Sequence, residues 1–222
     1  TALDNPVSFF TAQSLTQRAS DLSSLKDNMG QAIQTVKAAN AGISAITSLI
    51  AAAKSIAQSA KGTMDATSRA SYAAQYDTIL GQIDHAAADS GYKGTNLLNG
   101  DNLTVNFNET ASSTLTVTGF TATTGGDLTL TAAGTGWSAD ATGNTNIDNA
   151  VTALDGAVNT LRTNSASLSA NLNIISIRQD FTTQMVNTLA AGSDALTLAD
   201  TNQEGANMLM LQTRNSLGTT AL

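Results

Sequence analysis

An apolar side chain recurs at alternating steps of three and four residues along the chain from Leu22 to Met64. The positions are Leu22, Leu25, Met29, Ala32, Val36, Ala39, Ile43, Ile46, Ile50, Ala53, Ala57, Ala60 and Met64. The chain is 41% hydrophobic, so chance would fill a chosen register of this length only about once in 100,000. A helix carrying this stripe would be about 65 Å long. Such a rod cannot bury its stripe against itself, so other helices must lie along it.

The composition favours a thin helical bundle over a thick globule. Only 12% of the 222 residues are charged and 4% are aromatic, so small side chains must make most helix contacts. The absence of cysteine excludes disulfides and thiolate metal sites. A net charge of −7 argues against nucleic acid as a partner. We expect no run apolar enough to insert into a membrane and no cleaved signal peptide.

Two helices are predicted in the first hundred residues. Asn5 can cap a helix over residues 6–61, because Pro6 tolerates the first helical position. Asp65 can cap a second helix over residues 66–90, whose apolar stripe lets it fold back antiparallel on the first.

Two glycines lie inside the first predicted helix but off its apolar stripe. Gly30 and Gly42 each cost about 1 kcal/mol in helix propensity. We expect these positions to let a neighbouring element approach the helix closely.

Short β-strands are predicted after the second helix. Apolar and polar residues alternate in three segments, namely Leu103-Val105-Phe107, Leu115-Val117 and Leu128-Leu130. Residues 108–113 form a plausible hairpin connection between the first two. Residues 94–161 contain six acidic residues and no Lys, Arg or His, which is typical of a solvated face. We expect residues 101–144 to form a hairpin and a small outward-facing module.

The remaining sequence again predicts helices. The segment from Thr145 to Asp148 resembles a capping box that opens a third helix. Its stripe is Ile147, Val151, Leu154, Val158, Leu161, Ser165, Leu168, Leu172 and Ile175. The apolar register then shifts to steps of four, through Ile177, Phe181, Met185 and Leu189, which predicts local unwinding of the supercoil. Gly192-Ser193 should weaken the helix, and a last, unfinished amphipathic helix should begin near residue 204.

These elements predict a mainly α fold with a small β part. We expect a long antiparallel helical rod, like a coiled-coil bundle, with residues 1–100 and 145–222 as its two halves. The β-hairpin and the small β insertion would lie between these halves in the sequence.

The residue patterns give no sign of catalysis. There is no phosphate-binding loop, dinucleotide fingerprint or His-Glu-x-x-His pair, and His85 is the only imidazole. We therefore expect neither an enzyme nor a cofactor. Alternating oxygen side chains at residues 140–148 hint at a calcium loop, but Thr145 and Val151 replace its required Gly and Glu. Trp137, in a Gly-rich loop, either pins the β module to the rod or contacts a ligand such as a sugar.

Three segments resemble motifs of bacterial flagellins. Asn40-Ala41-Gly42-Ile43-Ser44, followed by residues 57–60, is similar to the signature near their N-terminal end. Tyr92-Lys93-Gly94-Thr95-Asn96-Leu97-Leu98 resembles their Phe-Asn-Gly-x-x-Leu-Leu element, with Tyr and Lys in place of Phe and Asn. Residues 207–218 are similar to the start of their C-terminal helix. Apart from residues 102–143, the resemblance covers nearly the whole chain.

The resemblance implies a structural subunit that self-assembles into the flagellar filament for motility. It also implies export through the flagellar channel without a cleaved signal peptide, and the export apparatus, an export chaperone and the filament cap as partners. Relative to the family pattern, the polymerising end segments are missing or cut short, so we expect a trimmed, monomeric form of a compact flagellin. The residues expected to pack in the core and between subunits are Leu22, Leu25, Met29, Val36, Ile43, Ile46, Ile50, Leu154, Val158, Leu161, Leu168 and Leu172.

One family feature is altered in this sequence. Many flagellins carry an Arg-Glu-Leu run that is central to recognition by Toll-like receptor 5, and here the matching residues are Ala53-Lys54-Ser55. The resemblance therefore implies weak or no recognition by that receptor. Two alternatives to a filament subunit stay open from the sequence: a hook-filament junction protein, and a cell-surface module that binds a glycan through Trp137.

Overall fold

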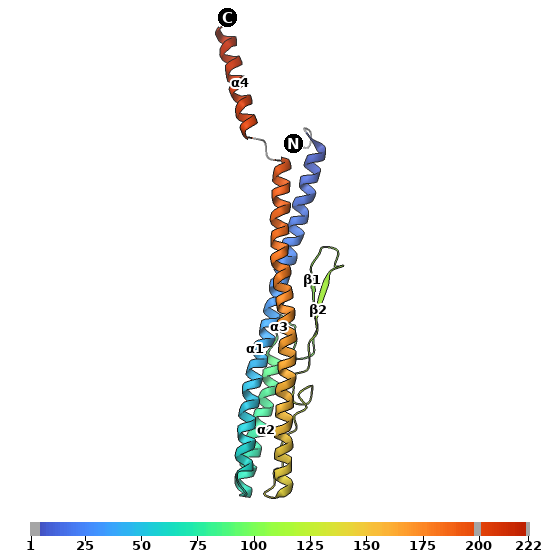
Figure 1. Cartoon of the computed structure of the whole chain (residues 1–222), viewed down its shortest axis with the longest axis vertical. Helices are drawn as coiled ribbons and strands as arrows, with labels where there is room; N and C mark the ends of the chain where they lie inside the picture. Colours follow the sequence, from blue (N-terminus) through green and yellow to red (C-terminus); the bar gives the residue numbers. More distant parts are fainter. Residues whose placement is uncertain (1–4, 198–200, 221–222) are drawn as a thin grey trace. The chain divides into compact units, whose positions relative to one another are not determined.

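The computed structural model describes residues 5–197 and 201–220, which form helices and one two-stranded antiparallel sheet. In chain order the elements are α1 (Pro6–Lys61), α2 (Ala66–Asp89), β1 (Leu103–Asn106), β2 (Thr114–Val117), α3 (Ala141–Thr197) and α4 (Thr201–Thr220), labelled in Figure 1. The predicted fold class, mainly α with a small β part, is confirmed.

The chain divides into two units, Leu25–Phe181 and Thr1–Ser24 with Thr182–Leu222. Within the larger unit, α2 and the enclosed parts of α1 and α3 lie side by side, and the hairpin of β1 and β2 lies along them (Figure 1). Within the smaller unit, the hydroxyl of Ser193 in α3 donates to the carbonyl of Ala12 in α1 at 3.1 Å. These contacts supply the helical partners that the apolar repeat requires.

Both predicted helix caps are present. The side-chain oxygen of Asn5 accepts the Ser8 N–H at 3.1 Å. The carboxylate of Asp65 accepts the Ser68 N–H at 2.7 Å, which lowers the pKa of Asp65. Each side chain satisfies a donor that has no partner within the first turn of its helix.

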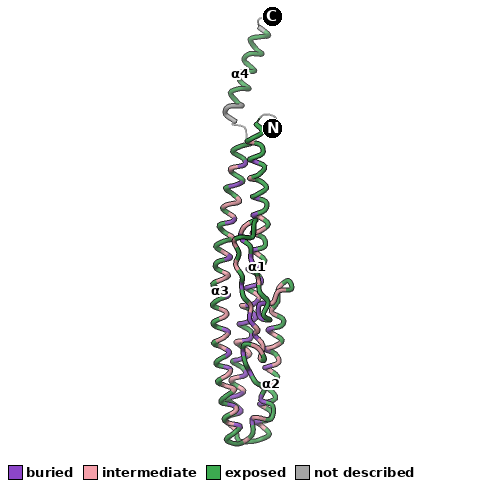
Figure 2. The backbone as a smooth tube through the Cα atoms, turned by 90° about the vertical axis from the view of Figure 1, so that its right-hand side faces the viewer, coloured by how far each residue is buried: buried purple, intermediate pink, exposed green. Residues whose placement is uncertain are grey.

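The apolar repeat of α1 lies in the core, seen as the buried stripe along the helices in Figure 2. Eleven of its thirteen positions are buried, Leu25 is half-buried, and Met64 is exposed because it lies beyond the end of α1. By length and composition alone, α1 could also cross a membrane. The expectation that no segment is long and apolar enough to cross a membrane is therefore wrong by this measure. The apolar stripe of α1 nevertheless faces the other helices.

The hairpin is confirmed, but the predicted third strand is absent from the described residues. β1 pairs with β2 from Leu103↔Val117 to Asn106↔Thr114. Residues 128–130 instead follow a turn, because Thr129 has a φ of +48° and its N–H donates to the carbonyl of Gly126 at 3.2 Å. Leu128 and Leu130 are both buried in this irregular segment. Their alternation therefore reflects two side chains entering the core rather than a strand.

The third helix begins earlier and continues further than predicted. α3 starts at Ala141, because the carboxylate of Asp140 accepts the Gly143 N–H at 2.8 Å and the Ser138 hydroxyl at 2.7 Å. The expected capping box at Thr145 and the oxygen-rich loop of residues 140–148 consequently lie in the first turns of the helix. Gly192 does not interrupt α3, which runs to Thr197.

The segment after α2 contains a tight turn. Tyr92 and Thr95 exchange backbone hydrogen bonds of 2.9 and 3.0 Å. The two residues between them, Lys93 and Gly94, have φ values of +49° and +82°. A two-residue hairpin turn of this kind favours Asn-Gly, so Lys93 adopts a conformation that costs it more than Asn.

Gly42 allows the close approach that its position predicted. A Cβ atom added there would lie 2.0 Å from the Ser90 Oγ and 2.7 Å from both the Ser90 Cβ and the Leu98 Cδ1. Ser90 is the C-cap residue of α2. Glycine at this position therefore lets the end of α2 and the following segment pack directly on the α1 backbone.

Candidate assembly surfaces

The residues expected to pack in the core or between subunits lie within the single chain. Nine of the twelve are buried, and Leu25, Val158 and Leu172 are half-buried. A buried side chain offers little area to another molecule, so these nine residues pack within the chain itself.

The buried seam of α3 keeps a constant spacing of seven residues. Its members are Ile147, Leu154, Leu161, Leu168, Ile175, Thr182 and Leu189, all buried. The predicted shift of register after Ile175 is therefore wrong for the seam, because Ile177 and Phe181 point away from it. The polar Thr182 holds the buried position instead.

Three apolar side chains outside the seam form an exposed ridge on α3. Ile174, Ile177 and Phe181 are 42%, 60% and 52% exposed and follow one another at steps of three and four residues. Residues at this spacing share one side of a helix. This ridge is a candidate contact surface of the larger unit.

The smaller unit also exposes apolar side chains. In α1 they include Val7 and Phe10, and in α3 Leu196. Four consecutive apolar residues of α4, from Met208 to Leu211, are more than half exposed. Because α4 presents apolar groups around its whole circumference there, it is a second candidate surface for contact with other molecules.

Two ion pairs join α1 to α3 in the larger unit. The Lys54 Nζ lies 2.6 Å from the Asp155 Oδ1, and the Lys61 Nζ lies 2.5 Å from the Asp148 Oδ1. From the first pair to the second the lysine lies seven residues later in α1 and the aspartate seven residues earlier in α3, as an antiparallel pair of helices requires. At the positions that align with the receptor motif, Lys54 is therefore engaged within the chain, and the adjacent Ala53 is buried.

A buried arginine, which the sequence reasoning missed, connects the ends of three helices. The Arg69 side chain is fully buried in α2. Its Nε donates to the Thr63 carbonyl at 2.6 Å, and its two terminal nitrogens donate to the Ser138 carbonyl and to the Asn144 side-chain oxygen. One terminal nitrogen also lies 3.3 Å from the Met64 sulfur. Arg69 thus joins the α1–α2 connection to the start of α3, in a way that no periodic pattern signals.

Two aspartates of α2 hold the irregular segment that follows the hairpin. The carboxylate of Asp77 accepts the backbone N–H groups of Ala133 and Gly134 at 2.6 and 3.0 Å. The carboxylate of Asp84 accepts the N–H and the hydroxyl of Thr124 at 2.6 and 2.9 Å. These two carboxylates therefore fix the irregular segment on α2.

Trp137 is 5% exposed, so its indole face is not available to stack on a sugar. Its ring centroid lies 4.8 Å from that of Tyr76 in α2, and this contact attaches the irregular segment to the helices. Burial, together with the negative charge of Asp77, raises the pKa of Tyr76 to about 12. The glycan-contact reading of Trp137 is therefore wrong in this structure.

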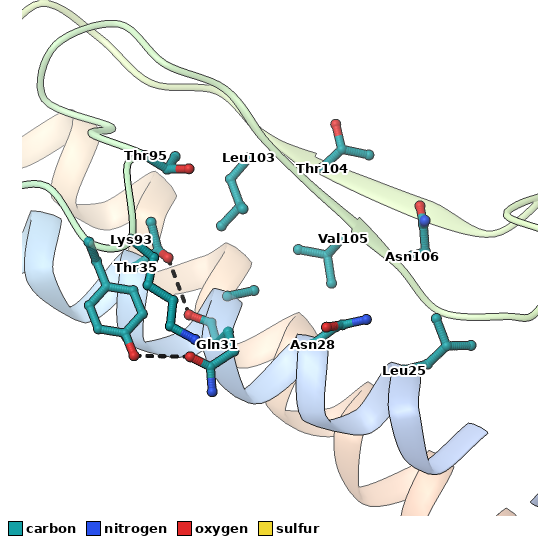
Figure 3. A pocket seen from close by; sticks show the side chains of 12 residues that line it. Leu25, Asn28, Gln31, Thr35, Lys93, Thr95, Leu103, Thr104, Val105 and Asn106 are labelled. Carbon is teal, nitrogen blue, oxygen red and sulfur yellow. Dashed lines mark hydrogen bonds between the residues drawn. The ribbon is translucent and has the colours of Figure 1, made fainter. Parts of the chain in front are cut away.

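A cleft of about 310 Å³ lies between β1 and α1. Figure 3 shows Leu103 and Val105 on the side of β1 that faces the helix, and Thr104 and Asn106 on the opposite side. At one end of the cleft the Tyr92 hydroxyl donates to the Gln31 side-chain oxygen at 3.0 Å. The cleft thus marks where the hairpin and the tight turn are held against α1.

Comparison with known proteins gives one consistent result. The family model described as "Bacterial flagellin N-terminal helical region" matches residues 1–103. Flagellin FljM of Caulobacter vibrioides is 30% identical over 224 residues, and flagellin FljN of the same organism is 31% identical; each alignment covers all of this chain and 80% of the relative. The crystal structure of Bacillus cereus flagellin shares the fold, with a TM-score of 0.58 at 20% identity, covering 70% of this chain and 88% of that one. The chain therefore belongs to the bacterial flagellin family and is a structural subunit of the flagellar filament.

Proposed function

We propose that this flagellin polymerises by burying its exposed apolar surfaces against neighbouring copies. These surfaces are the ridge from Ile174 to Phe181 in the larger unit and the apolar residues of α4 in the smaller one. The observation that carries the proposal is that the apolar repeats of α1 and α3 are already buried within the chain, whereas the side chains of these surfaces are exposed to water. Repetition of such contacts around a helical axis produces an open filament rather than a closed oligomer.

The test is polymerisation of the purified complete gene product, followed by sedimentation and negative-stain microscopy. A Phe181→Ser/Ile177→Ser variant should fold like the wild type, because both side chains are exposed, but should form fewer filaments. Far-UV circular dichroism of the monomer checks the fold. Normal assembly of this variant would exclude the ridge as a contact surface.

The proposed route to the filament is export through the flagellar channel, without cleavage of a signal peptide, to the cell exterior. An export chaperone and the filament cap would be partners on this route, as for the flagellins that the sequence resembles. Residues 1–100 and 145–222 would form the helical core, and residues 101–144 the outward-facing module. Intact-mass measurement of the subunit from sheared filaments, compared with the encoded protein, tests export without cleavage.

We also propose that Toll-like receptor 5 recognises this protein weakly or not at all. At the positions that match the receptor motif, Ala53 is buried and Lys54 places a positive charge where many flagellins have an acid. A receptor surface that is complementary to the acid would meet a like charge. Reporter cells with and without the receptor provide the assay, with a recognised flagellin as positive control. Receptor-dependent signalling of similar strength would contradict the proposal.

A further inference from the structure

One exposed methionine contacts a buried charge. Met64 lies in the connection between α1 and α2 and is 60% exposed, and its sulfur accepts an N–H of the buried Arg69 at 3.3 Å. Met208 and Met210 are similarly exposed, but among the described residues no donor forms a hydrogen bond to their sulfur atoms. Met29 is fully buried. At Met64, therefore, an oxidant in solution reaches a sulfur atom that is also a hydrogen-bond partner of a buried cation.

Arg69 is a buried cation whose hydrogen-bond acceptors carry no charge. Besides the Met64 sulfur, they are the carbonyl oxygens of Thr63 and Ser138 and the side-chain oxygen of Asn144. A buried guanidinium is stable only when acceptors replace the water that it has lost. A thioether sulfur is a weak acceptor. The sulfur is therefore the weakest of the four partners, and a better acceptor at this position would stabilise the buried cation.

We propose that Met64 is a site of reversible oxidation by a peroxide and that its sulfoxide oxygen becomes an acceptor for Arg69. In this step one peroxide oxygen forms a bond to the Met64 sulfur as the O–O bond breaks. The sulfur is oxidised and the peroxide is reduced, and with hydrogen peroxide the second product is water. A sulfoxide reductase, with a thiol as its reductant, restores the thioether.

The surroundings of Met64 accommodate the added oxygen. Because most of the side chain lies in water, it is free to withdraw and to place the oxygen where the sulfur lay. The S–O bond has its negative end on oxygen, so the hydrogen bond from the cationic Arg69 becomes stronger. At Met29, by contrast, the same oxygen would enter apolar packing and disrupt it. Oxidation of Met64 should therefore stabilise the junction between the α1–α2 connection and the start of α3 that Arg69 forms.

The first test uses the full chain with the substitutions Met185→Leu, Met208→Leu and Met210→Leu. Hydrogen peroxide should then add one oxygen atom to the peptide that contains Met64 and none to the peptide that contains Met29, as measured by mass spectrometry. The melting temperature should rise by about 2 °C, the size expected for one strengthened hydrogen bond in a chain of this length. Treatment with the two methionine sulfoxide reductases, one for each epimer, should reverse the rise. The same chain with Met64→Leu is the matched control and should not respond.

The second test examines the hydrogen bond to Arg69 itself. Met64→Gln supplies an amide oxygen, a stronger acceptor than a thioether, whereas Met64→Leu supplies none. The Met64→Gln variant should therefore melt at a higher temperature than Met64→Leu. This difference and the oxidation shift should both disappear in an Arg69→Leu background. The Nε–H resonance of Arg69, followed by NMR in the chain with Arg69 intact, should move on oxidation and gives a readout that does not require the Arg69→Leu variant to fold.

The outcomes separate the modification from its effect. If Met64 takes up no oxygen under conditions that oxidise Met208 in the wild type, the modification site is excluded. An unchanged or lower melting temperature after oxidation would overturn the contact with Arg69, as would an equal shift in the Arg69→Leu background or an Arg69 Nε–H resonance that stays in place. A reversible rise that requires Arg69 would support the proposal.

Discussion

The close packing at Gly42 leads to a prediction about two helical glycines. Replacement of a helical glycine by alanine ordinarily stabilises a helix by about 1 kcal/mol. Gly81→Ala should show this gain, since nothing lies within 4 Å of the added Cβ atom. Gly42→Ala should do the opposite, because its Cβ atom would lie 2.7 Å from the Ser90 Cβ.

The size of the effect follows from the atoms that must move. Leu98 can change its side-chain conformation, but the Ser90 Cβ moves only with the backbone at the end of α2, and the Ser90 hydroxyl donates to the Ala86 carbonyl at 2.6 Å. Overpacking of this kind costs about 1–3 kcal/mol. After subtraction of the propensity gain, we expect Gly42→Ala to lower the free energy of unfolding by up to about 2 kcal/mol.

Urea unfolding followed by far-UV circular dichroism measures both variants against the wild type. A double-mutant cycle with Ser90→Gly sharpens the test, because removal of the Ser90 side chain should return at least about 1 kcal/mol to Gly42→Ala. Stabilisation by Gly42→Ala alone, or additive effects in the cycle, would show that the two helices do not meet at this position.

Three further predictions concern single side chains. Arg69→Met should lower the free energy of unfolding by about 3 kcal/mol through the loss of three hydrogen bonds. The control Arg162→Met, at an exposed position, should change it by less than about 0.5 kcal/mol. Trp137 fluorescence during urea unfolding measures both variants, and equal effects would refute the role of Arg69. Lys93→Asn should stabilise the fold by about 0.5–1 kcal/mol, because Asn adopts positive φ more readily, and a lower urea midpoint would contradict this. The Gly143 N–H and the Ser138 hydroxyl lower the pKa of Asp140 in the folded protein. The ionised carboxylate therefore stabilises the fold above the ordinary pKa of 3.8, and this contribution is lost as the pH falls through the lower pKa of the folded protein. The melting temperatures of wild type and Asp140→Asn should therefore converge on acidification toward pH 2, and a constant difference would count against the cap.

The sequence determined the helices because their signals are local. The alternating steps of three and four residues made the long helices necessary, and Asn5 and Asp65 marked two starts through hydrogen bonds to nearby N–H groups. The hairpin was also predictable from two alternating segments of similar length. Each of these features depends on residues within a few positions of one another.

Other features of the fold depend on contacts between residues that lie far apart in the sequence. Leu128 and Leu130 alternate like a strand, but both enter the core from a turn. Arg69 has no local pattern, since its partners at Ser138 and Asn144 lie about seventy positions away. For Trp137 the sequence left two roles open, and its contact with Tyr76 shows that it packs against the helices.

The α3 seam shows where the sequence alone stops being sufficient. After Ile175 the sequence offers two registers that meet again at the buried Leu189. The register through Ile177 and Phe181 leaves these two apolar side chains exposed, whereas the other buries Thr182. Because an apolar side chain can gain free energy either within its own chain or against another molecule, hydropathy alone does not separate the two destinations. The tertiary structure decides between them, since the seam at intervals of seven is filled inside the chain. The sequence by itself thus determined that α3 is an amphipathic helix, and only the tertiary structure decided which apolar face is left for other molecules.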